Sequence, residues 1–65
     1  MIKPEDALAL RIKYDNIEDA TSELRDLFNK EGEPPEGEWF RWIRDYLTRY
    51  YEVPREVFIE RNKSD

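Results

Sequence analysis

Carboxylates are the most plentiful groups in this sequence that could perform acid–base or metal chemistry. The chain of 65 residues contains 16 aspartates and glutamates, and Glu18, Asp19, Glu23 and Asp26 fall on one arc of a predicted helix. A pair of carboxylates cleaves a glycoside only where one of them has a raised pKa and a cleft admits the sugar. A domain of this size has little room for such a cleft, so we interpret the arc as a solvated helix face.

Nucleophilic catalysis has few candidate groups in the chain. Histidine and cysteine are absent, and the hydroxyls of serine and threonine are limited to Thr21, Ser22, Thr48 and Ser64. Such a hydroxyl needs a neighbouring base to become a nucleophile, and no imidazole is present to act as one. The absence of thiols also excludes disulfides, zinc fingers and thiol redox chemistry.

The segment from Gly32 to Glu38 places three glutamates between and beside two glycines, a composition that is also found in calcium loops. The acid spacing of an EF-hand is absent, however, and Pro34 and Pro35 interrupt the segment. The glycine spacing of a phosphate-binding loop is missing as well. The sequence therefore predicts no catalytic residue, no metal ligand and no cofactor, and we expect no enzymatic activity.

Aromatic and arginine side chains gather in the C-terminal half of the sequence. Seven of the nine aromatic residues lie between Trp39 and Phe58. Large rings let a small domain bury much apolar area with few residues, which favours a core role. Trp, Tyr and Arg also dominate the binding energy of protein interfaces, which favours an interaction role. The residues that would form such an interface are Phe40, Arg41, Trp42, Arg44, Arg49 and Tyr51.

The charge of the chain limits its partners. A formal net charge of -5 repels the phosphates of nucleic acids and favours solubility. No apolar run approaches the roughly 18 residues that a membrane span needs, and the first residues do not resemble a signal peptide. We predict a soluble protein, cytoplasmic if it is natural, that binds neither nucleic acid nor membrane. A monomer or homodimer fits, with another protein as the possible partner.

Two helices are predicted in the middle of the chain. The first follows Asn16, a residue type that caps helices, and ends near Gly32, where a C-terminal glycine is expected. Its apolar stripe consists of Ile17, Ala20, Leu24, Leu27 and Phe28. The second runs from Glu38 to about Tyr51, and the short linker between the two helices implies that they are antiparallel. Two i,i+4 pairs, Asp26–Lys30 and Asp45–Arg49, have the favourable order for ion pairing.

Both ends of the chain allow two interpretations. Residues 7–14 alternate between apolar and small or polar side chains, which predicts a half-buried strand, although Pro4 and the two acids after it resemble a first helical turn. Val57–Ile59 is β-branched and aromatic, which predicts a second short strand through about Arg61. Alternatively, Pro54 begins a last helix that extends to about Asn62.

These elements predict one compact domain over residues 1–65 with an α+β fold. Its order would be strand-helix-helix-strand, with two antiparallel helices packed on one face of a small antiparallel sheet. The alternative is an all-α bundle of three to four short helices.

The helix caps, turn residues and charges along the sequence all agree with one fold, and this agreement bears on the origin of the chain. The Asn16 cap, the acids in the first helical turns, the glycine at residue 32 and the loop prolines resemble the sequences of computationally designed miniproteins. The absence of Gln and Cys fits design and also fits a hyperthermophile, and both imply a thermostable protein. The resemblance implies a designed scaffold with no natural biochemical activity. The alternative is a small acidic protein–protein interaction module, of viral or archaeal inhibitor type, that acts through the aromatic and arginine helix face.

Overall fold

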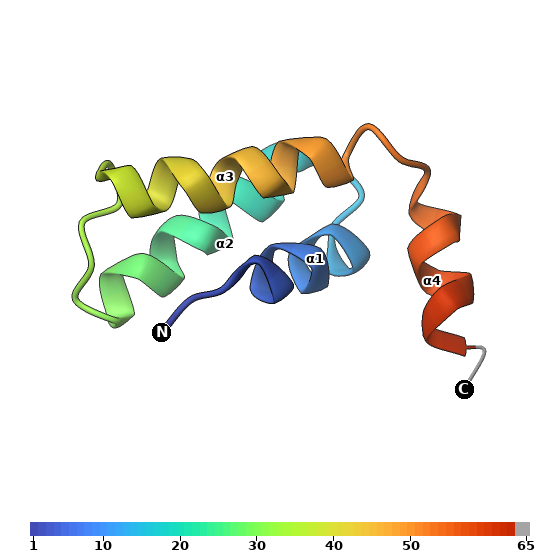
Figure 1. Ribbon diagram of the computed structural model, residues 1–65, viewed down its shortest axis with the longest axis horizontal. Helices are drawn as coiled ribbons and strands as arrows, with labels where there is room; N and C mark the ends of the chain where they lie inside the picture. Colours follow the sequence, from blue (N-terminus) through green and yellow to red (C-terminus); the bar gives the residue numbers. More distant parts are fainter. Residues whose placement is uncertain (64–65) are drawn as a thin grey trace.

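The computed structural model describes residues 1–63, with side chains to residue 61, and this part of the chain forms four helices and no strand. The helices are α1 (Pro4–Lys13), α2 (Ile17–Lys30), α3 (Glu38–Tyr50) and α4 (Arg55–Lys63). Helices α1, α2 and α3 lie alongside one another, and α4 crosses one end of the group (Figure 1). The prediction of an α+β fold with strands around residues 7–14 and 57–61 is therefore wrong. The described part of the chain is all-helical.

Helix α1 occupies the segment whose alternating pattern predicted a strand. Pro4 is the first residue of the helix, and the Asp6 carboxylate accepts a hydrogen bond of 2.8 Å from the Lys3 backbone amide, so local contacts define the helix start. Its buried side chains are Ala7, Leu10 and Arg11. Their spacing of three and four residues is helical. The strand interpretation failed because it treated Arg11 as a solvent-facing residue.

Helix α2 begins and ends where the sequence predicts. The Asn16 side chain accepts a hydrogen bond of 2.9 Å from the Asp19 backbone amide, which confirms the predicted cap. Gly32 follows the helix with a φ of 76°, a conformation that favours glycine. The Glu33 amide then donates to the Phe28 carbonyl at 2.9 Å, which with an inner bond from the Gly32 amide completes a Schellman motif.

Helices α2 and α3 run in opposite directions, as their short linker predicts (Figure 1). Their apolar faces meet in the core, where the rings of Phe28 and Phe40 make an edge-to-face contact at a centroid distance of 5.1 Å. The buried apolar residues of the core are Ile2, Ala7, Leu10, Ala20, Leu24, Phe28, Phe40, Ile43 and Leu47. Each of the first three helices thus contributes one stripe to a single core.

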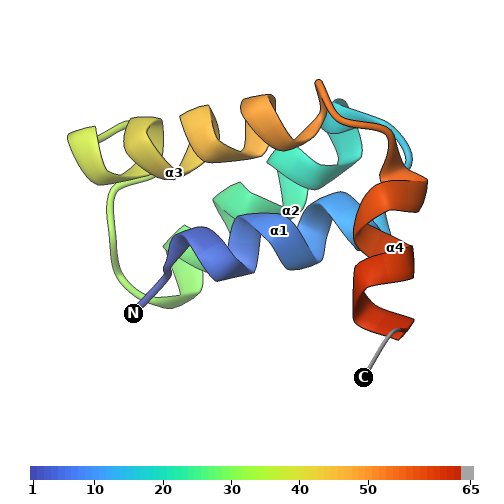
Figure 2. The same cartoon turned by 45° about the vertical axis from the view of Figure 1, so that its right-hand side comes forward.

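Helix α4 forms where Val57–Ile59 predicted a strand. A strand with no neighbouring strand leaves its backbone amides and carbonyls unpaired, whereas a helix pairs them internally. None of the side chains of residues 55–61 is buried, and Val57 is 38% exposed. Helix α4 lies across the ends of α1 and α3 (Figure 2). It is a peripheral element rather than part of the core.

A buried arginine joins the ends of α1 and α3. Arg11 is 6% exposed, and its Nε and Nη2 atoms donate to the backbone carbonyls of Tyr50 and Val53 at 3.1 and 3.0 Å. Its guanidinium lies 4.2 Å from the centroid of the Tyr51 ring. Carbonyls at a helix C-terminus lack partners within the helix, so Arg11 supplies donors to groups that need them.

Two further contacts complete this junction. Arg55 at the start of α4 donates from Nε and Nη2 to the Ile12 carbonyl, at 2.9 and 2.6 Å. The Tyr51 hydroxyl donates to the Tyr14 carbonyl at 2.8 Å. The end of α1 is therefore bound to the α3–α4 turn by hydrogen bonds to backbone carbonyls.

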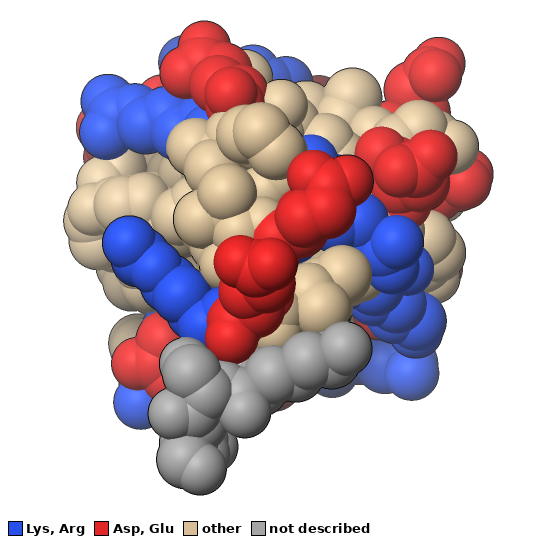
Figure 3. All heavy atoms as spheres, turned by 90° about the vertical axis from the view of Figure 1, so that its right-hand side faces the viewer, with Lys and Arg blue, Asp and Glu red and all other residues tan. Residues whose placement is uncertain are grey.

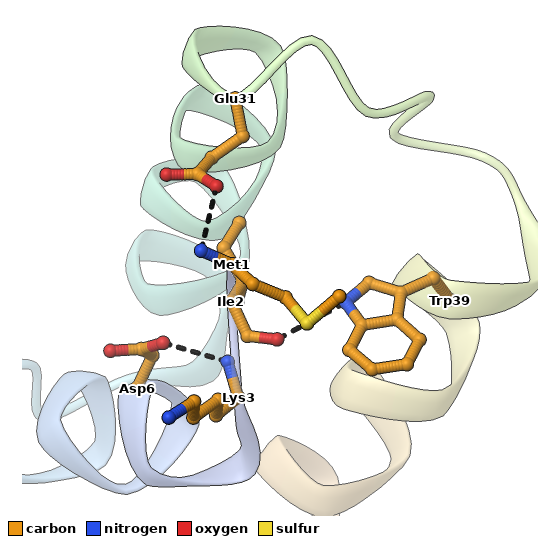
Figure 4. Close-up of polar contacts among 6 residues, drawn as sticks. All are labelled: Met1, Ile2, Lys3, Asp6, Glu31 and Trp39. Carbon is orange, nitrogen blue, oxygen red and sulfur yellow. Dashed lines mark hydrogen bonds and ion pairs between the residues drawn. The ribbon is translucent and has the colours of Figure 1, made fainter.

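Residues 1–3 lie at the opposite end of the molecule (Figure 1). Ile2 is buried, and its carbonyl accepts a hydrogen bond of 3.2 Å from the indole N–H of Trp39 (Figure 4). The amine of Met1 forms an ion pair of 3.1 Å with Glu31 just beyond α2 (Figure 4). These contacts connect the N-terminal segment to the end of α2 and to the start of α3.

Candidate functional site

The structure places the six predicted interface residues in different environments. Phe40 is 2% exposed and belongs to the core. Tyr51 is half buried and uses its hydroxyl to bind the Tyr14 carbonyl, so it holds the fold together. The exposed members are Arg41, Trp42, Arg44 and Arg49.

The exposed members do not share one surface. Successive residues of a helix are about 100° apart around its axis, so Trp42 and Arg44 lie about 200° apart on α3. Residues on the Trp42 side approach α1, since Trp39 binds the Ile2 carbonyl just before that helix. Arg44 lies on the other side and lines a hollow between α2 and α3. The predicted interface is thus divided into an aromatic part and an arginine part.

The aromatic part is a continuous row of ring contacts along α3. We call it the aromatic ridge, and it consists of Trp39, Trp42, Tyr46, Tyr50 and Phe58. Successive ring centroids are 5.2, 5.5, 6.4 and 5.7 Å apart, and the Trp42–Tyr46 and Tyr50–Phe58 contacts are edge-to-face. The last contact carries the ridge from α3 onto α4. Such ring pairs are mutually stabilising.

Trp42 is the exposed end of the ridge. It is 46% exposed, whereas Trp39 is half buried and holds the Ile2 carbonyl. The two indoles, with Glu38, line a hollow on the surface. A hollow walled by two indoles accommodates an apolar side chain, and the neighbouring carboxylate favours a positive charge beside it.

Acidic residues border Trp42 on α3. Glu38 precedes it by one helical turn and Asp45 follows it by three residues, and both are exposed. Neither forms an ion pair or a side-chain hydrogen bond within the described part of the chain. The expected Asp45–Arg49 pair does not form, and the Arg49 guanidinium instead lies 6.0 Å from the centroid of Tyr46. The expected pair of Asp26 with Lys30 is also absent among the described residues.

Among the carboxylates of α2, Glu23 is bound by two side chains at the end of α1. Glu23 accepts hydrogen bonds from the Tyr14 hydroxyl and, at 3.0 Å, from the Lys13 ammonium. The Tyr14 hydrogen bond and then that of Lys13 lower the pKa of Glu23, which is the opposite of what a general acid needs. Among the residues that the structure describes, no three His, Cys, Asp or Glu side chains are close enough to hold a metal ion.

The surface over α4 has no dominant charge. Figure 3 shows acidic and basic side chains intermixed over uncharged surface at this end of the molecule.

Within residues 1–63, no helix has the length and apolar composition that crossing a bilayer requires.

Sequence reasoning missed two parts of these surfaces. Phe58 joins the ridge only because α4 is a helix that folds back against Tyr50, and the signal for it was the proline at residue 54. Arg25 joins Arg44 across the groove between α2 and α3, a proximity that no local pattern encodes.

No protein-family model, curated protein or solved structure matches the chain.

Proposed function

We propose that this protein is a small, soluble, non-enzymatic interaction module that binds a basic protein segment through the Trp42 end of the aromatic ridge. The observation that carries the proposal is the 46% exposure of Trp42, whose ring nevertheless contacts both Trp39 and Tyr46. Tryptophan is among the residues that contribute most to binding energy. An indole that is already held by two neighbouring rings loses little further side-chain entropy on binding.

The core of α3 is complete without Trp42. Ile43 and Leu47 are fully buried and Phe40 nearly so, and these residues lie on a different side of the helix. The part of the Trp42 indole that faces water adds nothing to this core, although the ring contacts with Trp39 and Tyr46 hold the indole in place. Its exposed surface, continuous with the rings of Trp39 and Tyr46, is therefore open to a partner.

Charge indicates the kind of partner. Glu38 and Asp45 border Trp42 with no ion-pair partner in the described residues, and the chain as a whole carries a net charge of -5. A partner that complements this surface has an apolar side chain for the hollow between the indoles and Lys or Arg residues beside it. A second copy of the chain fits less well, because it would bring Glu38 and Asp45 of two acidic chains together.

The experiment is a fluorescence anisotropy titration with a labelled synthetic helical peptide of leucine and lysine. A leucine and glutamate peptide of the same length is the charge control. We expect the lysine peptide to bind and the glutamate peptide not to bind. Trp42→Ala should weaken binding by about tenfold or more, whereas Val57→Ala, at an exposed apolar residue outside the ridge, should leave it unchanged.

Two results would contradict the proposal. Equal binding by the Trp42→Ala variant would mean that only the overall negative charge attracts the peptide. A dimer in light scattering that Trp42→Ala converts to a monomer would mean that the ridge is covered by a second copy.

A designed scaffold with no biological activity is the second candidate. It is supported by the agreement of local signals with the fold, such as the Asn16 cap and the Schellman motif at Gly32. A scaffold of this kind would bind the lysine peptide no better through Trp42 than through any other exposed residue.

A further inference from the structure

A second surface, on the other side of α3, is built from arginines rather than aromatic rings. Arg25 of α2 and Arg44 of α3 both line two neighbouring hollows between these helices. Arg41 lines one of the hollows with them and lies three residues before Arg44, on the same side of α3. Three guanidiniums from two helices therefore border one groove, which we call the arginine groove.

These arginines are not neutralised by the protein itself. None of Arg25, Arg41 and Arg44 forms an ion pair or donates a hydrogen bond from its side chain to another described residue. The chain contains 16 acidic residues against 11 basic ones, so acids are available in number. In contrast, the two arginines at the α1 junction, Arg11 and Arg55, each donate from Nε and Nη2 to backbone carbonyls.

The arginine groove includes a buried ring that contacts Arg25 and a hydroxyl that is available as a hydrogen-bond donor. The Arg25 guanidinium lies 5.8 Å from the centroid of Phe40, whose ring is buried and packs edge-to-face on Phe28. This contact limits the freedom of the Arg25 side chain. Ser22 lines the groove one turn before Arg25, and its hydroxyl has no hydrogen-bond partner in the described part of the chain. The hydroxyl of Thr48, in contrast, donates to the carbonyl of Arg44 at 3.0 Å.

We propose that the arginine groove binds a phosphate monoester, held between Arg25 and Arg44, with Arg41 as the further donor in one hollow and Ser22 as the further donor in the other. Planar guanidiniums bind phosphate oxygens through paired N–H groups, and two walls that each contribute one guanidinium suit an anion with several acceptor oxygens. A hydroxyl adds a neutral donor to the same oxygens. This site is independent of the aromatic ridge, because Trp42 and Arg44 lie on opposite sides of α3.

Two glutamates that line the arginine groove limit the size of the anion that fits it. Glu18 lines one hollow and Glu36 lines the other, so a carboxylate lies toward each end of the groove. A single phosphate group between them meets three guanidiniums, whereas the flanking phosphates of a nucleic acid strand would meet the carboxylates. The groove therefore favours an isolated phosphate on a protein segment or on a small molecule.

The test is an NMR titration of the ¹⁵N-labelled protein at constant ionic strength. The probes are inorganic phosphate, a short phosphoserine peptide and the same peptide without phosphate, with chloride as the background anion. We expect saturable shifts of the amides of Ser22, Arg25 and Arg44 with the two phosphate-bearing probes only. Arg44→Gln and Arg25→Lys should each weaken binding by about tenfold, because the first removes a charge and the second removes the paired N–H geometry.

Arg49→Gln is the matched control, since it removes the same charge from the Trp42 side of α3 and should leave binding unchanged. Tighter binding of the phosphopeptide than of inorganic phosphate would identify a protein segment as the source of the phosphate, and equal binding would identify a small anion. The absence of saturable shifts, or equal weakening by Arg49→Gln and Arg44→Gln, would overturn the proposal.

Discussion

Arg11 and Arg55 bind backbone carbonyls across the same junction in opposite directions. Arg11 extends from α1 to the carbonyls of Tyr50 and Val53, and Arg55 extends from α4 to the carbonyl of Ile12. Helices α1 and α3 both end here, and a helix C-terminus carries a partial negative charge. Two guanidiniums therefore stabilise two helix ends and, in doing so, join α4 to the rest of the molecule.

Replacing the buried arginine should destabilise the protein. Arg11→Met leaves the Val53 carbonyl without its side-chain donor and the Tyr50 carbonyl with only the 3.4 Å bond from the Val53 amide, and we expect a loss of about 2 kcal/mol in the free energy of unfolding. Arg11→Lys should recover only part of this, because one ammonium cannot reproduce both donors of the guanidinium. Urea denaturation followed by circular dichroism measures the change. Arg49→Met, at an exposed site, should cost less than about 0.5 kcal/mol, and a similar loss in both variants would contradict the role of Arg11.

The contact between Tyr14 and Glu23 should make stability depend on pH at both extremes. The Tyr14 hydrogen bond, followed by that of Lys13, lowers the pKa of Glu23, so its contribution is present above the ordinary carboxyl value of about 4.3 and is lost as the pH falls through the lowered pKa. The hydrogen bond to Glu23 raises the pKa of Tyr14, so that contribution is present below about 10 and is lost as the pH rises through the raised pKa.

Tyr14→Phe should therefore flatten the dependence of the urea midpoint on pH below about 4 and above about 10. The acidic dependence should become smaller without vanishing, because Lys13 still binds Glu23. Tyr46→Phe serves as the control, since the Tyr46 hydroxyl has no hydrogen-bond partner among the described residues. Identical pH profiles for the wild type and Tyr14→Phe would show that the contact contributes nothing to stability.

The turn after α2 should tolerate asparagine better than alanine. Gly32 has a φ of 76° and a Cβ at this position would meet nothing within 4 Å, so any cost of substitution comes from the backbone conformation alone. Gly32→Ala should cost about 1 kcal/mol, as expected for a left-handed residue with a Cβ. Gly32→Asn should cost less, because asparagine adopts this conformation more readily. Thermal unfolding of the two variants measures the difference, and equal stability would argue against the left-handed turn.

The two tryptophans should differ in their fluorescence. Trp39→Phe leaves Trp42 as the emitter, and we expect red-shifted emission and strong quenching by acrylamide because this indole is 46% exposed. Trp42→Phe leaves Trp39, which is half buried and bonded to the Ile2 carbonyl, so its emission should be bluer and its quenching weaker. Equal quenching in both variants would mean that Trp42 is covered in solution.

The sequence predicted the middle of the fold because local chemistry determines it. The cap at Asn16, the glycine at residue 32 and the stripe from Ala20 to Phe28 act within a few residues of one another. The ends of the chain were predicted wrongly because their structure depends on distant partners. Arg11 is a polar residue in the sequence pattern, yet it is buried, because carbonyls at the end of α3 and just beyond it accept its hydrogen bonds.

The same limit applies to the candidate surfaces. Trp42 and its exposure could be anticipated from its place at the edge of the apolar arc of α3. The separation of Trp42 from Arg44 follows from helical geometry, whereas the pairing of Arg44 with Arg25 requires the packing of two helices. The sequence thus predicted residues of both surfaces and could not predict how the fold divides them.

The two sets of polar contacts that α1 makes, with α2 and with the α3–α4 turn, should respond differently to pH. The junction is held by hydrogen bonds from Arg11 and Arg55 to backbone carbonyls, which are not titratable groups. The Tyr14–Glu23 contact between α1 and α2, in contrast, is lost when the pH falls through the lowered pKa of Glu23 and when it rises through the raised pKa of Tyr14. Extremes of pH should therefore weaken the polar contact between α1 and α2 first, while the shared apolar core still holds α2 against α1 and α3.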